Sequence, residues 1–195
     1  MAEYTSQTAL IVVDVQNDFA HPDGTICVEG AAAAIARINE EIALALDGGA
    51  AVVYTQDWHP PETPHFERPD GRWSTHCVRD TWGAEFHADL RIVGERIVHK
   101  GTGLEDDFSG FAARDREAPA ERAAVLQAML DELGVTRIAV TGLATGGCVR
   151  ATALDGCALG YETTVILDAT APVDLAAGVG VEAVAEMRAA GIRIE

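Results

Sequence analysis

RIAVTGLATGGCVRATALDG, residues 137–156, is the stretch that decides the fold of this chain. Residues 137–141 are mostly apolar and predict a buried strand, and the Gly- and Thr-rich residues after them predict a tight turn. A helix is then expected to open at Cys148 and to run over residues 149–159. A strand, a turn and a helix in this order indicate an α/β protein.

The same alternation continues through the rest of the chain. Short apolar runs rich in β-branched residues predict strands at residues 9–13, 51–55, 96–99, 137–141, 163–167 and 192–195. Ala-rich runs with apolar residues at helical spacing predict helices at residues 31–46, 120–133, 149–159 and 176–190. We therefore expect an α/β fold, a three-layer, doubly wound sheet of about six mainly parallel strands with helices on both faces.

Length and composition indicate one soluble domain. The 195 residues are 48% hydrophobic, which is enough for one sizeable core, so we expect a single domain over 1–195. A formal net charge of −17 would repel nucleic acid and anionic membrane surfaces. The N-terminus has no basic stretch followed by an apolar one, and no apolar run reaches the roughly 18 residues of a spanning helix. We expect a cytoplasmic homo-oligomer that binds a small-molecule substrate and neither membrane nor nucleic acid.

Cys148 has the most reactive side chain of the 137–156 stretch. A thiol at a helix N-terminus faces unpaired N–H groups and the positive end of the helix dipole, which favour the thiolate. The alternative is a buried cysteine that only packs in a turn of small residues, as free cysteines often do. The four cysteines of the chain form no dense disulfide framework, so reduced thiols are expected.

Other polar residues directly follow predicted strands. Asp14 follows the first strand, Asp57 the second and Lys100 the third, and Cys148 follows the fourth after its turn. Ligands of open parallel sheets bind outside the carboxyl ends of the strands, so these four side chains should meet at one edge. Each alone has a structural explanation, such as capping a turn. Their occurrence together favours a catalytic site.

A long segment rich in Pro, His and aromatic residues, at about 57–89, suggests a metal site. Asp57 and His59 lie two apart at a strand end, and His65 and His76 follow in the same loop. One carboxylate and two or three imidazoles suit Zn²⁺, with Mn²⁺ or Fe²⁺ possible. The spacing is not that of a zinc finger, so a catalytic rather than a structural metal is expected, although scattered loop histidines can also be simply solvated.

Six motifs, spread over nearly the whole length, carry a family resemblance. They are LIVVDVQNDF at 10–19, TQDWHPP at 55–61, WSTHC at 73–77, HKGTG at 99–103, SGF at 109–111 and GLATGGCVRATALD at 142–155. In these motifs the chain resembles the nicotinamidases and pyrazinamidases of the isochorismatase-like cysteine hydrolases. The resemblance implies an enzyme that hydrolyses nicotinamide to nicotinate and ammonia in NAD salvage, through a cysteine thioester and with a bound divalent metal.

The resemblance also implies a role for each candidate residue. Catalysis would fall on Asp14, Lys100 and Cys148, and the metal on Asp57, His59, His76 and a fourth ligand, His65. Phe19 and Trp73 would sandwich the pyridine ring, although either could be a core aromatic. Ala144 would line the substrate site, follow a cis peptide bond from Leu143, and form the oxyanion hole with the N–H of Cys148.

That set of residues meets the chemical needs of amide hydrolysis. A carboxamide is a poor electrophile, so its hydrolysis needs a strong nucleophile, a stabilised oxyanion and protonation of the leaving ammonia. Asp14 would take the thiol proton and later deliver it to ammonia, and Lys100 would hold Asp14 in place. The metal could lower the pKa of a water molecule or anchor the ring nitrogen of the substrate, and the sequence leaves both roles open.

The sequence departs from the family pattern beside the cysteine. Many nicotinamidases have Asp and then Tyr or His there, and relatives that hydrolyse N-carbamoyl compounds have Ser and Gly, whereas this chain has Gly146 and Gly147. Ser74 and Thr75 also stand where Pro is frequent. The alternative function is therefore a cysteine amidase for another carboxamide or an N-carbamoyl compound. A non-catalytic binding module is the alternative of a different class.

Overall fold

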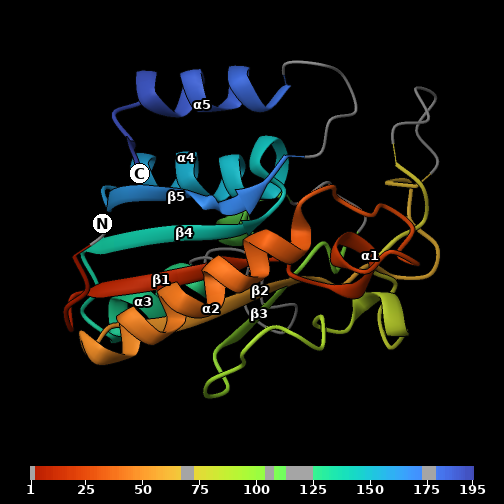
Figure 1. Cartoon of the computed structure of the whole chain (residues 1–195), viewed down its shortest axis with the longest axis horizontal. Helices are drawn as coiled ribbons and strands as arrows, with labels where there is room; N and C mark the ends of the chain where they lie inside the picture. The colour runs from red at the N-terminus through yellow and green to blue at the C-terminus, as the bar shows by residue number, and fades with distance from the viewer. Residues whose placement is uncertain (1–2, 67–72, 104–107, 113–124, 173–178) are drawn as a thin grey trace.

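The computed structural model of the chain describes residues 3–66, 73–103, 108–112, 125–172 and 179–195. Six parallel strands form one sheet in the order β3-β2-β1-β4-β5-β6 (Figure 1). The strands are β1 (Thr8–Val13), β2 (Ala51–Asp57), β3 (Ile97–Lys100), β4 (Arg137–Leu143), β5 (Glu162–Ala171) and β6 (Arg193–Ile194). The predicted α/β sheet of about six parallel strands is confirmed.

Helices connect the strands. They are α1 (Asn17–Ala20), α2 (Ala31–Asp47), α3 (Val125–Glu132), α4 (Arg150–Ala158) and α5 (Val179–Ala189), with 3-10 turns η1 (Trp82–Ala84) and η2 (Gly110–Ala112) and a π-helical turn η3 (Thr145–Val149). Parts of two predicted helices, 120–124 and 176–178, lie outside the described residues. The helix expected to open at Cys148 instead begins after η3. No helix of the described residues is both long and apolar enough to cross a membrane.

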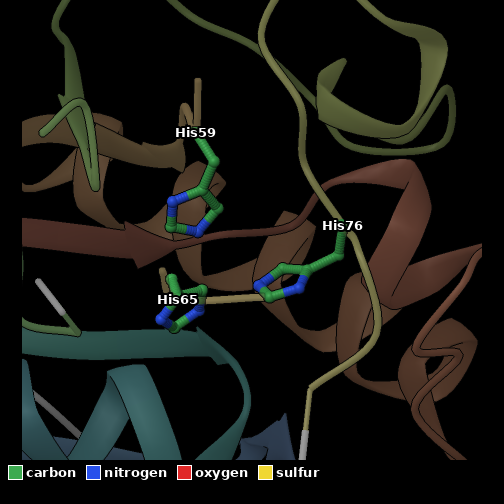
Figure 2. A group of neighbouring side chains, drawn as sticks. All are labelled: His59, His65 and His76. Carbon is green, nitrogen blue, oxygen red and sulfur yellow. The ribbon is translucent and has the colours of Figure 1, made fainter. Parts of the chain in front are cut away.

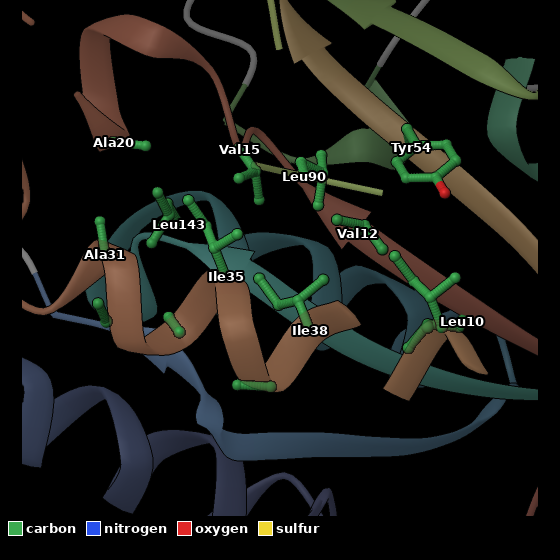
Figure 3. Close-up of a cluster of buried hydrophobic side chains, with 14 of the residues drawn as sticks. Leu10, Val12, Val15, Ala20, Ala31, Ile35, Ile38, Tyr54, Leu90 and Leu143 are labelled. Atoms are coloured by element: carbon green, nitrogen blue, oxygen red, sulfur yellow. The ribbon is translucent and has the colours of Figure 1, made fainter. Parts of the chain in front are cut away.

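Side chains of the strands point alternately into two separate hydrophobic cores, one on each face of the sheet. On one face, α2 packs buried residues such as Ile35 and Ile38 against Leu10 and Val12 of β1 (Figure 3). On the other face, residues of α3, α4 and α5 pack against the opposite side of the strands, including Ile11. Every residue of β1 is buried, as expected for a parallel strand covered on both faces.

Strand β5 is longer than predicted because it contains an irregularity. Val140 of β4 pairs with Val165, but Gly142 pairs with Thr170, so β5 advances by five residues where β4 advances by two. The exposed Asp168 lies in the irregular part and accepts a hydrogen bond from Arg37 at 3.1 Å. After it, the chain returns to the sheet and extends β5 to Ala171.

The order of the strands creates a crevice between β1 and β4. From β1 the sheet grows outward through β2 and β3 on one side, and through β4, β5 and β6 on the other. Such a switch point is where open α/β sheets bind their ligands. Val13 and Gly142 face each other at this point. Gly142 has φ of +113°, and a Cβ there would lie 2.1 Å from the Val13 carbonyl oxygen.

We predict that Gly142→Ala lowers the free energy of unfolding by more than Gly49→Ala does. Gly49 also has a positive φ, +75°, but a Cβ there meets no atom of the described residues within 4 Å. The control Gly49→Ala therefore loses about 1–3 kcal/mol of stability from backbone strain alone, without a steric clash. Urea denaturation measures both variants, and equal losses would contradict the close approach of β1 and β4.

Candidate active site

Lys100, the last residue of β3, is the centre of a group of buried side chains at the carboxyl ends of the strands. Its side chain is fully buried, and its Nζ lies 2.8 Å from Asp14 Oδ2. The same Nζ forms an ion pair with Asp57 Oδ1 and donates a hydrogen bond to Cys148 Sγ at 3.4 Å. The four residues predicted to meet at this edge of the sheet are therefore in contact.

The strand ends hold the two carboxylates in place. Asp14 directly follows β1 in a left-handed conformation, with φ of +49°. Its Oδ1 accepts a hydrogen bond of 2.6 Å from the hydroxyl of Thr55 on β2, a buried residue that the sequence did not single out. Asp57 is the last residue of β2. Sγ of Cys148 and one carboxylate oxygen of each aspartate lie within 4.8 Å of one another.

The two carboxylates differ in their affinity for a proton. Burial raises the pKa of Asp14, and the opposing effect of Lys100 does not compensate, because Asp57 adds a second negative charge. Burial also acts on Asp57, but Lys100, His59 and His76 outweigh it and lower the pKa of Asp57. The ion pairs keep the pKa of Lys100 well above its usual range despite burial. Asp14 is therefore the carboxylate suited to accept and return a proton.

The side chain of Cys148 is a protonated thiol in the resting protein. Burial raises its pKa well above the ordinary value, and the two aspartates raise it further, while Lys100 alone lowers it. Cys148 also sits inside η3 and not at the first turn of α4. The expectation that a helix N-terminus favours the thiolate is therefore wrong for the resting protein, and a base is needed when Cys148 attacks.

Hydrogen bonds hold the turn that carries Cys148 in place. It starts with a cis peptide bond between Leu143 and Ala144, as the resemblance implies. The Ala144 carbonyl accepts hydrogen bonds from the N–H groups of Gly147 and Val149, at 3.0 and 3.3 Å. The turn is also linked to β5, because the hydroxyl of Thr145 is 2.8 Å from that of Thr170, which follows the irregular part of β5.

Three imidazole rings lie beside Asp57. Figure 2 shows His59, His65 and His76 turned toward one another, and one ring nitrogen of each lies within 4.8 Å of the other two. The Nε2 atoms of His59 and His76 are 3.7 and 4.0 Å from Asp57 Oδ2. The Asp57 carboxylate therefore has one oxygen toward Lys100 and the other toward the histidines.

This cluster fits a divalent metal ion. Nδ1 of His59 lies 3.1 Å from the Gly101 carbonyl, and Nδ1 of His76 lies 2.7 Å from the Ser74 carbonyl, an arrangement that turns Nε2 inward in each ring. The buried Nε2 of His59 has no hydrogen-bond partner among the described residues. Burial lowers the pKa of His76 to about 4, so its ring is neutral at pH 7. Neutral imidazoles and a carboxylate are the donors that Zn²⁺ prefers.

Side chains just after β1 hold the segments that carry these ligands, and sequence analysis did not assign them this role. The buried Gln16 donates from Nε2 to the Asp57 carbonyl at 2.8 Å, and its Oε1 accepts from the Asp57 N–H at 2.9 Å. Asp18 accepts a 2.7 Å hydrogen bond from the N–H of Cys77, next to His76. Gln16 and Asp18 therefore determine where Asp57 and His76 lie.

A mostly apolar pocket opens beside the thiol. Its lining includes the predicted substrate residues Phe19, Trp73 and Ala144, and also Phe108, which the sequence did not single out. The other lining residues are Asp57, His76, Leu143, Gly147 and Cys148. Ring centroids of Phe19 and His76 are 5.4 Å apart, and those of Trp73 and Phe108 are 6.4 Å apart. The pocket thus joins the thiol, the histidine cluster and an aromatic wall.

We predict that iodoacetamide alkylates Cys148 slowly at pH 7, and that the rate still rises above pH 9. A raised pKa reduces the thiolate fraction at any given pH, and the thiolate is the form that alkylates. Mass spectrometry of the Cys148 peptide measures the rate, with glutathione as the reference thiol. A rate that levels off below pH 8 would contradict the protonated resting thiol.

We predict that Gln16→Ala weakens Zn²⁺ binding by about 10-fold, because Asp57 loses the side chain that holds its backbone. Asn39→Ala is the matched control. Asn39 makes the same kind of paired contact, to the backbone of Asp89 and Arg91, on another part of the chain. Competition with a coloured chelator measures affinity, and thermal melting checks the fold. Equal Zn²⁺ affinity in both variants would contradict this role of Gln16.

Comparison with known proteins places this geometry in a family. The isochorismatase domain model matches residues 8–194. The nicotinamidase/pyrazinamidase of Mycobacterium tuberculosis is 40% identical over 190 residues, covering 95% of this chain and 97% of that protein. A crystal structure of Pyrococcus horikoshii pyrazinamidase in complex with zinc is 37% identical, with a TM-score of 0.82 over 97% of this chain and 98% of that one. PnC1 from L. infantum, solved in complex with nicotinate, is 30% identical, with a TM-score of 0.83 over 100% and 95%. The chain belongs to the isochorismatase family.

Proposed function

We propose that this chain is an amidohydrolase that converts nicotinamide to nicotinate and ammonia. The observation that carries the proposal is the buried contact of Lys100 with Asp14 and Cys148 at the base of an aromatic pocket. Relatives at 30–40% identity that are nicotinamidases support the same activity.

The first half of the reaction forms a thioester. As the Cys148 sulfur attacks the amide carbon, Asp14 accepts the thiol proton, for which its raised pKa suits it. The backbone N–H groups of Ala144 and Cys148 are the proposed donors to the oxyanion. When the tetrahedral intermediate collapses, the C–N bond breaks and Asp14 passes the proton to the leaving ammonia.

The second half releases the acid. A water molecule attacks the thioester carbon and gives one proton to Asp14. As the C–S bond breaks, Asp14 returns that proton to the Cys148 sulfur, and the carboxylic acid that forms loses its own proton to solvent to give nicotinate. Lys100 keeps its charge, because Asp57 and either the Asp14 carboxylate or the Cys148 thiolate lie beside it and hold its pKa high. It therefore holds Asp14 beside the sulfur and lies next to the negative charge that develops there.

The residues proposed to hold a divalent ion are Asp57, His59, His65 and His76, and we propose Zn²⁺, with Mn²⁺ or Fe²⁺ as alternatives. When bound, the ion supplies a Lewis acid at the pocket wall. His76 and Asp57 line both the cluster and the pocket, so they connect the two. The proposed place in NAD salvage follows from the reaction, whereas the cytoplasmic location and the homo-oligomeric state stay predictions from the sequence.

A second candidate function is hydrolysis of an N-carbamoyl compound or a non-aromatic carboxamide. It is favoured by Gly147, because this pocket residue has no side chain and a Cβ there meets no atom of the described part of the chain within 4 Å. The aromatic lining from Phe19, Trp73 and Phe108 favours the ring of nicotinamide instead.

We predict that the wild-type protein releases ammonia from nicotinamide, and that Cys148→Ala lowers kcat at least about 1,000-fold because the nucleophile is lost. Cys157→Ala is the control, since that thiol donates to the Ala190 carbonyl and does not line the pocket. An ammonia assay covers nicotinamide, pyrazinamide and N-carbamoylsarcosine, before and after chelation.

Activity confined to N-carbamoylsarcosine would overturn the nicotinamidase proposal in favour of the second candidate. Full activity of Cys148→Ala on nicotinamide would overturn the assignment of the nucleophile.

A further inference from the structure

One wall of the pocket beside Cys148 consists of bare backbone. Gly147 immediately precedes the nucleophile, lines the pocket and is half-buried. A Cβ built on it meets no heavy atom of the described residues within 4 Å. Its φ of −114° and ψ of −109° lie outside both the helical and the extended regions, so the backbone there also favours glycine. As far as the described residues go, the space beside Gly147 is therefore open.

Two other glycines near the site have no room for a side chain. A Cβ on Gly142 would lie 2.1 Å from the Val13 carbonyl oxygen, and one on Gly101 would lie 2.4 Å from the His59 ring. Packing requires glycine at both positions. At Gly147 packing does not require it, and glycine there leaves space in the pocket.

Most of the remaining pocket lining consists of side chains, several of them large. Phe19, Trp73, Phe108 and Leu143 are large side chains, and Phe19 and Leu143 are buried in the protein. The pocket has an empty volume of about 360 Å³, which includes space open to solvent. A carboxamide whose amide carbon lies at the Cys148 sulfur has its ring in this same pocket, and at Gly147 no atom of the described residues fills the adjacent space.

We propose that Gly147 is a specificity-determining residue, and that its bare backbone admits aromatic carboxamides carrying a small alkyl substituent on the ring. This inference rests on the proposed function and names its substrate class. A side chain at residue 147 would occupy the space of the substituent. One methyl group of steric conflict in such a pocket changes discrimination by roughly 10- to 200-fold.

The test compares nicotinamide with its 2-, 4-, 5- and 6-methyl isomers in an ammonia assay. We expect the wild-type protein to hydrolyse at least one isomer with kcat/KM within about 10-fold of that for nicotinamide. For that isomer, Gly147→Val should lower the ratio of its kcat/KM to that of nicotinamide by about 10-fold or more, and Gly147→Ala by less. Using the ratio within each variant removes effects on the amount of folded enzyme.

Gly49→Ala is the control, because Gly49 also has open space around its Cα but lies outside the pocket, and it should leave the ratio unchanged. Hydrolysis of nicotinamide without any methyl isomer, or an unchanged ratio in both Gly147 variants, would overturn this inference and leave the proposed function standing. Failure of the wild-type protein to hydrolyse nicotinamide would overturn the proposed function and this inference together.

Discussion

The burial of Lys100 between Asp14 and Asp57 is the constraint on which the rest of the site depends. A charged amine with a fully buried side chain is costly unless its partners are charged and close. Those partners come from the ends of β1 and β2, next to β3, so the parallel register of three strands has to be correct before the charges can meet. The sheet thus positions the catalytic groups, and the ion pairs in turn connect its strand ends.

Sequence patterns were sufficient for the fold where they reflect local geometry. Buried parallel strands such as β1 are continuous apolar runs, and α2 carries its apolar residues at helical spacing, so both could be recognised. The second half of β5 could not, because an exposed Asp168 interrupts the apolar run and the strand resumes after an irregularity. The form of η3 was also missed, since neighbouring glycines carry no periodic signal.

For the site, too, the sequence was informative only where local geometry leaves a pattern in it. Asp14, Asp57, Lys100 and Cys148 could be found because each follows a strand, and the strand ends of a parallel sheet meet. The role of Gln16 could not be found, since its partner is a backbone group 41 residues away that leaves no mark on the sequence. The protonation of the thiol was missed for a related reason, because the burial and the two aspartates that raise the pKa of Cys148 come from segments distant in the sequence.

The Asp57 carboxylate has one oxygen toward Lys100 and the other toward the histidines. It therefore couples the catalytic residues to the metal-binding residues. An engineer who wished to change the preferred metal could not replace Asp57 by a histidine without removing half of the negative charge that surrounds a buried lysine. Changes of metal preference therefore have to come from the three histidine positions.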